Sequence, residues 1–170
     1  DRARLLSDIT MALSDAHGRV LAEPIAHLEL KEIGPEDWQA MASGAGLLAG
    51  KPIPEIAVDI RDHEVFVAGE HVNRGYLDPS DDKSTKSISG GKPWHRTGDA
   101  ARLDERGRLW LLGRREAASG GLFPFAIETA ALSWPGVRQA ALLAGDVRAK
   151  LALAGDSLDQ SALQQRAAQL

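Results

Sequence analysis

The chain has 170 residues, of which 44% are hydrophobic and 26% are charged, and its formal net charge is -4. These proportions are typical of a globular protein, and the mixed charges predict no basic surface for nucleic acid or an anionic membrane. No apolar run approaches the ~18 residues of a membrane-spanning helix. Cysteine is absent, which excludes disulfides and thiolate metal sites, and we expect a cytoplasmic protein on this basis.

The first fifty residues alternate between helical and extended patterns. Residues 2–13 have apolar side chains at helical spacing, and the apolar stretch 19–30 is predicted to be extended. A short helix is predicted over 34–41, because Pro35 stands at its first turn. A loop is predicted to follow, marked by three closely spaced glycines, Gly44, Gly46 and Gly50.

A first hairpin is predicted after this loop. Residues 55–61 alternate apolar and polar side chains, as a half-buried strand does, and 64–68 form its partner across the two residues 62–63. Residues 72–77 then lead into 78–91, which are rich in Ser, Lys and Asp. We interpret that last segment as a mobile surface loop.

A second hairpin contains the most informative segment of the chain. Residues 93–99 and 103–114 have apolar stretches on both sides of the four-residue turn Asp104–Gly107. Asp99 and Arg114 close the two ends of this unit. A carboxylate can accept both hydroxyls of a ribose, and a guanidinium can donate to the same sugar or to its phosphate.

The last third of the chain follows a different pattern. Residues 113–121 are predicted to mark a change of domain. A helix over 125–133, strands over 137–144 and 149–154, and a last helix from Leu158 onward are predicted after it. The chain contains no internal repeat.

Several of these segments together resemble one family. The block Arg96-Thr97-Gly98-Asp99, the hairpin, and Gly113-Arg114 resemble a motif of the acyl-adenylate-forming enzymes, which include acyl-CoA synthetases, luciferases and peptide-synthetase adenylation domains. The run Gly121-Leu122-Phe123 resembles the corresponding segment in the branch of the family that contains long-chain fatty acyl ligases. Further segments resemble the family in the family's own order, namely 22–26, 46–54, 63–77, 128 and 135–143.

The resemblance implies a fold class of α+β, as part of the adenylate-forming enzyme fold. Residues 1–114 correspond to the C-terminal part of the large adenylation domain, a small β-barrel-like subdomain. Residues 115–170 correspond to the start of the small α+β C-terminal domain, which is mobile in the family.

The resemblance also implies an activity. The parent enzyme is expected to activate a carboxylic acid, here a fatty acid, with ATP as acyl-AMP, and to transfer it to a thiol such as coenzyme A, with Mg²⁺ as cofactor. Asp99 and Arg114 would hold the AMP ribose, His95 would stack near adenine, and Glu116 stands where the family usually has an Asp hinge. Seen without the motif, Asp99 is a turn residue, Arg114 a surface ion pair and His95 a half-exposed strand residue.

Other side chains are expected to be structural. The remaining histidines are scattered without ligand spacing, so no metal site is predicted in this chain. The tryptophans are expected to fill the core or an interface. These tryptophans are Trp38, Trp94, Trp110 and Trp134.

The sequence also departs from the family. The Ser/Thr/Gly-rich phosphate loop and the catalytic Lys are not among these residues, and Val20-Leu21 stand where the family has Thr-Glu. Either this pair is substituted, or about five residues are missing between Leu21 and Ala22. The chain starts at Asp1 within an apparently helical stretch, so we interpret it as a fragment of a longer protein. Without the phosphate loop and the catalytic Lys we expect the fragment to be inactive alone, and its open strand edges make it prone to dimerise. The alternatives are a degenerate, non-catalytic nucleotide-binding or interaction module and an unrelated all-β binding domain.

Overall fold

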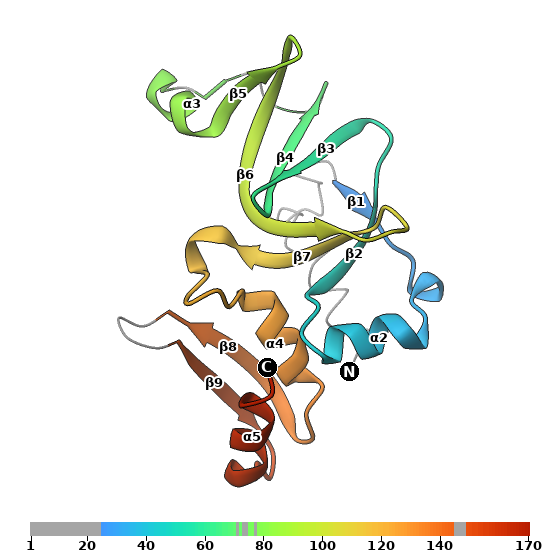
Figure 1. Cartoon of the computed structure of the whole chain (residues 1–170), viewed down its shortest axis with the longest axis vertical. Helices are drawn as coiled ribbons and strands as arrows, with labels where there is room; N and C mark the ends of the chain where they lie inside the picture. Colours follow the sequence, from blue (N-terminus) through green and yellow to red (C-terminus); the bar gives the residue numbers. More distant parts are fainter. Residues whose placement is uncertain (1–24, 71, 73–74, 77, 145–148) are drawn as a thin grey trace, which may run out of the picture.

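The computed structural model describes residues 25–70, 72, 75–76, 78–144 and 149–170 (Figure 1). The helix predicted over 2–13, the first half of the extended stretch 19–30 and the Val20-Leu21 departure lie outside these residues. No helix in the described ranges is long and apolar enough to cross a membrane.

The larger part of the described chain is one curled antiparallel sheet of seven strands (Figure 1). Its order is β1-β2-β7-β6-β4-β3, and β5 pairs with β6 beside this path. The strands are β1 Ala26–His27, β2 Leu47–Pro52, β3 Ile56–Arg61, β4 Glu64–Gly69, β5 Lys86–Ser89, β6 Lys92–Leu103 and β7 Leu109–Arg114.

The long strand β6 is central to this sheet. It pairs with β4, β5 and β7, and its register shifts against β7 between Ala100 and Ala101. A second shift lies between Glu64 and Phe66, where β4 pairs with β6. Such irregularities increase the local bend and twist of a sheet, which fits the curled course of β6 in Figure 1.

Both predicted hairpins are confirmed. β3 and β4 are joined through Asp62 and His63, which have φ values of 49° and 64°, as a tight two-residue turn requires. β6 and β7 are joined through the predicted turn, in which the Gly107 amide donates to the Asp104 carbonyl at 2.9 Å.

The helices and a second, two-stranded sheet complete the described structure. α4 packs on β8, and it also contacts β7 and α2, so it lies between the two sheets (Figure 1). The mixture of helices with antiparallel strands agrees with the predicted class. The elements are η1 Leu30–Glu32, α2 Pro35–Ala42, α3 Pro79–Thr85, η2 Arg115–Ala117, α4 Pro124–Leu132, β8 Val137–Leu143, β9 Lys150–Gly155 and α5 Gln160–Ala167.

One predicted loop is wrong. Residues 78–91 contain α3 and β5. Asp78 caps α3, because its carboxylate accepts the Ser80 amide at 2.8 Å, and Pro79 begins the helix. β5 is stabilised by pairing with β6, a non-local contact that polar composition does not reveal.

Two smaller predictions also need correction. Gly50, predicted in a loop, lies inside β2 at a register shift with φ of +95°. The backbone approaches closely there, since a Cβ on Gly50 would lie 2.0 Å from the His27 carbonyl. Within the described end of the stretch 19–30, only β1 is a strand, and residue 30 already begins the 3₁₀ helix η1.

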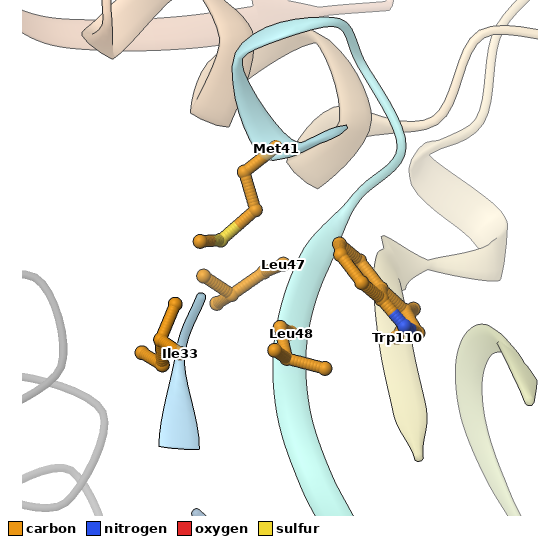
Figure 2. Close-up of a cluster of buried hydrophobic side chains, with 5 residues drawn as sticks. All are labelled: Ile33, Met41, Leu47, Leu48 and Trp110. Atoms are coloured by element: carbon orange, nitrogen blue, oxygen red, sulfur yellow. The ribbon is translucent and has the colours of Figure 1, made fainter. Parts of the chain in front are cut away.

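Apolar side chains gather on both sides of the large sheet and beneath α4. The first cluster joins α2 to β2 and β7 (Figure 2) and consists of Ile33, Met41, Leu47, Leu48 and Trp110. The second comprises Ile56, Val65, Val67, Ala101 and Leu109, and the third Ala131, Trp134 and Val137. The prediction that tryptophans fill the core is confirmed for Trp110 and Trp134, which are buried.

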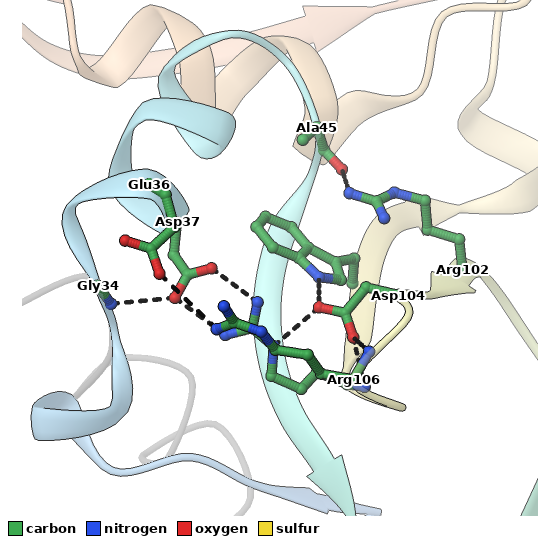
Figure 3. Close-up of polar contacts among 9 residues, drawn as sticks. Gly34, Glu36, Asp37, Ala45, Arg102, Asp104 and Arg106 are labelled. Carbon is green, nitrogen blue, oxygen red and sulfur yellow. Dashed lines mark hydrogen bonds and ion pairs between the residues drawn. The ribbon is translucent and has the colours of Figure 1, made fainter.

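A buried ionic network ties α2 to the β6–β7 turn (Figure 3). Arg108 donates two hydrogen bonds to the Asp37 carboxylate, at 2.9 and 2.7 Å, and a third to Asp104 at 2.8 Å. Trp110 Nε1 adds a bond of 3.0 Å to the same Asp104 oxygen. Burial would raise the pKa of Asp104, but the bonds from Trp110 and Arg108 outweigh it and lower the pKa to about 2.

Replacing Arg108 with Ala should therefore destabilise the protein strongly. The buried carboxylate of Asp37 and the partly buried carboxylate of Asp104 would lose their guanidinium. The expected cost is about 3–5 kcal/mol, measured as the free energy of unfolding in urea. Arg106→Ala is the matched control, because Arg106 is 64% exposed and lies 3.7 Å from Glu36. We expect it to change stability by less than about 0.5 kcal/mol. Equal losses in the two variants would contradict a buried role for Arg108.

The depressed pKa of Asp104 predicts acid sensitivity. A carboxylate whose folded pKa is below its unfolded value stabilises the fold above the unfolded pKa, and this contribution is lost as the pH falls through the folded pKa. For Asp104 the interval runs from the ordinary value of 3.8 to about 2. As the pH is lowered through this interval, the free energy of unfolding should fall in the unmodified chain. In Asp104→Asn the fall should be smaller by about 2 kcal/mol, because the ionisable group is absent. Parallel pH profiles would refute this.

Candidate functional site

The predicted pair Asp99 and Arg114 is brought together by the register of β6 and β7. These two residues are direct partners across the strands. Arg114 Nη1 lies 3.0 Å from Asp99 Oδ1 and also donates to the Thr97 carbonyl at 2.9 Å. The side chains are 37% exposed for Asp99 and 55% for Arg114. The two opposite charges therefore lie together where a dissolved ligand can reach them.

The two residues before Asp99 hold its backbone in place. The Thr97 hydroxyl donates to the Val65 carbonyl at 3.2 Å on β4, and it accepts the Asp99 amide at 3.0 Å. Gly98 has φ of +75°, a conformation that glycine adopts without strain. A Cβ on Gly98 would lie 2.9 Å from Arg114 Nη2, so the absence of a side chain also makes room for the guanidinium.

His95, the third predicted binding residue, lies further along β6. Its strand partners are Lys86 on β5 and Val67 on β4, and its ring centroid is 6.0 Å from that of Tyr76. Burial, and then the Lys86 charge, keep the pKa of His95 below its usual value. Its Nδ1 is buried and has no hydrogen-bond partner among the described residues. The imidazole of His95 is therefore half-buried and less basic than usual.

His95 is not joined to the other two predicted residues. Within the described part of the chain, no hydrogen bond or ion pair connects it to Asp99 or Arg114. The structure thus brings together two of the three predicted binding residues. Stacking of His95 against a ligand stays a prediction.

A second ionic cluster beside the pair was not predicted from the sequence. Glu64 on β4 is only 3% exposed, and its carboxylate accepts two bonds from Arg96, at 3.1 and 2.8 Å. Arg115, which follows Arg114, donates a third bond at 2.6 Å. Burial would raise the pKa of Glu64, but the two guanidinium groups outweigh it and hold the pKa below its ordinary value.

A sequence signal for this cluster did exist. Glu64 is a charged residue at the head of the otherwise apolar run 64–68, and Arg96 begins the Arg-Thr-Gly-Asp motif. A charge at the edge of a buried strand requires a partner of opposite sign. The sequence does not say which arginine supplies it, because Glu64 and Arg115 meet only through the folding of the sheet.

The predicted hinge residue, Glu116, is exposed and lies in η2. This short 3₁₀ helix has no buried residues and follows directly on β7. The role of Glu116 as a hinge stays a prediction. No group of three or more His, Asp or Glu side chains that could hold a metal ion occurs among the described residues.

Comparison with known proteins gives relatives of one type. No protein-family model matches the chain. It is 36% identical over 100 residues to a methyl-dioxo-octahydro-indenyl-propanoyl:CoA ligase from Rhodococcus jostii, covering 56% of this chain and 19% of that protein. It is 36% identical over 106 residues to a 2-succinylbenzoate–CoA ligase from Geobacillus sp., covering 54% of this chain and 21% of the relative.

A solved structure agrees with these relatives. O-succinylbenzoate coenzyme A synthetase from Bacillus subtilis, in complex with AMP, superposes with a TM-score of 0.54 at 29% identity. The match covers 70% of this chain and 28% of that protein.

These matches confirm the resemblance found in the sequence. Over the matched residues the chain is similar to CoA ligases and to an adenylate-forming synthetase. The aligned region spans about a fifth of the length of the curated relatives.

Proposed function

We propose that this chain is part of an AMP-dependent ligase that activates a carboxylic acid as acyl-AMP and transfers it to a thiol such as coenzyme A. The observation that carries the proposal is the exposed Asp99–Arg114 pair at the ends of the β6–β7 hairpin. The CoA-ligase relatives and the AMP complex of the Bacillus subtilis synthetase support it.

The pair suits a nucleotide for a chemical reason. Arg114 Nη1 donates to Asp99 Oδ1. Among the described residues, Asp99 Oδ2 and Arg114 Nη2 have no hydrogen-bond partner, so both can meet a ligand. We infer that the carboxylate accepts the ribose hydroxyls while the guanidinium donates to the sugar or phosphate. Hydrogen bonds to charged groups are the stronger ones, so the pair can fix the nucleotide's orientation.

The chemistry at the phosphates is not assigned to these residues. The reaction class requires Mg²⁺ and a cation to stabilise charge that builds up on phosphate. The described residues form no cluster that fits a metal ion. Residues 83–92 are rich in Ser, Thr, Gly and Lys, but they form the end of α3, the strand β5 and the turn into β6, and we do not assign them as the phosphate loop. We expect no acyl-AMP formation from these 170 residues alone.

We propose three finer features. The acid is a fatty acid, from the Gly-Leu-Phe run at 121–123, whereas two of the relatives are named for 2-succinylbenzoate and for a ring-bearing propanoate. The chain is divided between residues 114 and 115 into a barrel-like subdomain and the start of a second domain. Glu116 is the pivot of that second domain, beside the small residues 117–121, which permit backbone rotation.

A second candidate function is a non-catalytic module that binds a nucleotide without activating an acid. Val20-Leu21, in place of the Thr-Glu pair of the family, favours it. The two candidates agree on the Asp99–Arg114 pair and differ only in turnover.

ATP–pyrophosphate exchange by the natural gene product tests the proposal. We expect exchange with an added carboxylic acid, and Asp99→Asn should raise the KM for ATP about 10- to 100-fold, since charged hydrogen bonds to the ribose are weakened. Glu105→Gln, an exposed change on the same hairpin, is the control and should have no effect.

Each outcome of this test has a separate meaning. Absence of exchange with retained AMP binding would favour the non-catalytic module. Absence of both, or an Asp99→Asn protein with unchanged kinetics, would overturn the assignment of the site.

The glycine before Asp99 allows a second test, on AMP affinity. In Gly98→Ala the new Cβ would displace Arg114 Nη2, so AMP should bind about tenfold more weakly as one charged bond is lost. Gly90→Ala is the matched control, because Gly90 also has positive φ, of +60°, but has open space around it. Both changes strain the backbone by about 1 kcal/mol. Equal AMP affinities, measured by calorimetry, would contradict the role of Arg114.

A further inference from the structure

The connection between β7 and α4 is held mainly by short-range bonds. Its first part, η2, has no buried residue and is closed by the Ala118 amide donating to the Arg115 carbonyl at 3.2 Å. Ser119 and Leu122 then exchange two backbone bonds of 3.0 Å. The two glycines between them, at 120 and 121, have open space around them. Local bonds of this kind permit the segment to change direction as a unit.

One side chain ties this connection to the large sheet. Arg115 reaches from η2 to β4, where its Nη1 lies 2.6 Å from Glu64 Oε2. The Arg115 side chain is 45% exposed, whereas that of Glu64 is 4% exposed. The Arg115 guanidinium can therefore separate from the contact and be hydrated, while the Glu64 carboxylate stays buried.

Glu64 keeps a second partner when Arg115 withdraws. Arg96 on β6 binds both oxygens of the carboxylate, in the two-pronged geometry that suits a guanidinium. Arg96 is itself anchored to α3, because its Nη1 donates to the Ser84 carbonyl at 3.0 Å. A buried carboxylate that loses its last partner is strongly destabilising. Glu64 avoids this loss because both of its oxygens remain bonded to Arg96.

We propose that Glu64 is a positioning residue that holds the segment Arg115–Ala117 against the sheet through a releasable ion pair with Arg115. Separation of Arg115 from Glu64 breaks one charged contact. The pairing of β4 with β6 stays intact, and the buried carboxylate of Glu64 keeps its bonds from Arg96. The inference deepens the proposed function and rests on it, because the segment held in this way contains the proposed pivot Glu116. Glu64 and Arg115 would then set how readily the second domain turns.

Hydrogen exchange of the nucleotide-free chain tests this contact. In Arg115→Leu we expect amide exchange at Ala118, Ser119 and Leu122 to rise about tenfold, the effect of losing one charged hydrogen bond. Amides of β4 and β6 should exchange at the unmodified rate, because Arg96 still pairs with Glu64. Arg115→Lys, which keeps the charge, should restore part of the protection.

Two comparison variants sharpen the result. Arg106→Leu removes an exposed arginine on another turn and should leave the exchange of the β7–α4 connection unchanged. Arg96→Leu should raise exchange in β4 and β6, because Arg115 alone then pairs with the buried carboxylate.

Unchanged exchange at the connection in Arg115→Leu would overturn the proposal, and so would an equal rise throughout β4 and β6. The readout needs no nucleotide and no turnover. Absence of ATP–pyrophosphate exchange would therefore refute the proposed ligase activity without affecting this measurement. Unchanged amide exchange in Arg115→Leu would refute the role of the ion pair without affecting the proposed ligase activity.

Discussion

The pairing of β6 with β7 is the constraint on which the rest of the described structure depends. Its register places Asp99 opposite Arg114. At its turn Asp104 binds Arg108, and Arg108 joins the hairpin to Asp37 of α2. β7 also pairs with β2, and β6 with β4 and β5. Because a shift of one residue would turn every side chain to the opposite face, the same register that packs the core also forms the candidate binding pair.

Two buried carboxylates flank this hairpin, and they are stabilised in different ways. Asp37 is bound by Arg108, which is itself mostly shielded from solvent and is shared with Asp104. Glu64 is bound by Arg96 and Arg115, whose side chains are partly exposed. The network around Arg108 resists change, since each charge in it depends on the others. The cluster around Glu64 is asymmetric, with one bidentate partner and one single bond, and its weaker contact faces the connection to α4.

The sequence predicted those features that depend on neighbouring residues. Turn residues and the alternation of apolar and polar side chains predicted both hairpins. Proline at the first turn predicted α2, and helical spacing predicted α4. The length of the second hairpin then placed Asp99 and Arg114 at its two ends. The Glu64 cluster was missed because its members are 32 and 51 positions apart, and nothing local distinguishes one exposed arginine from another. The segment 78–91 was misjudged for a related reason, since β5 is polar and is a strand only because β6 offers it an edge.

The short turn of the β6–β7 hairpin has a consequence for the order of folding. Closing it requires only the four residues Asp104–Gly107, whereas β2 reaches β7 by pairing Leu47 with Leu111. The entropy lost on closing a loop grows with its length, and distant pairings are slow to form. The two charged ends of the hairpin can thus meet before the surrounding sheet is complete. Pairing with β4 then adds support from outside the hairpin, because the Thr97 hydroxyl that accepts the Asp99 amide also donates to the Val65 carbonyl.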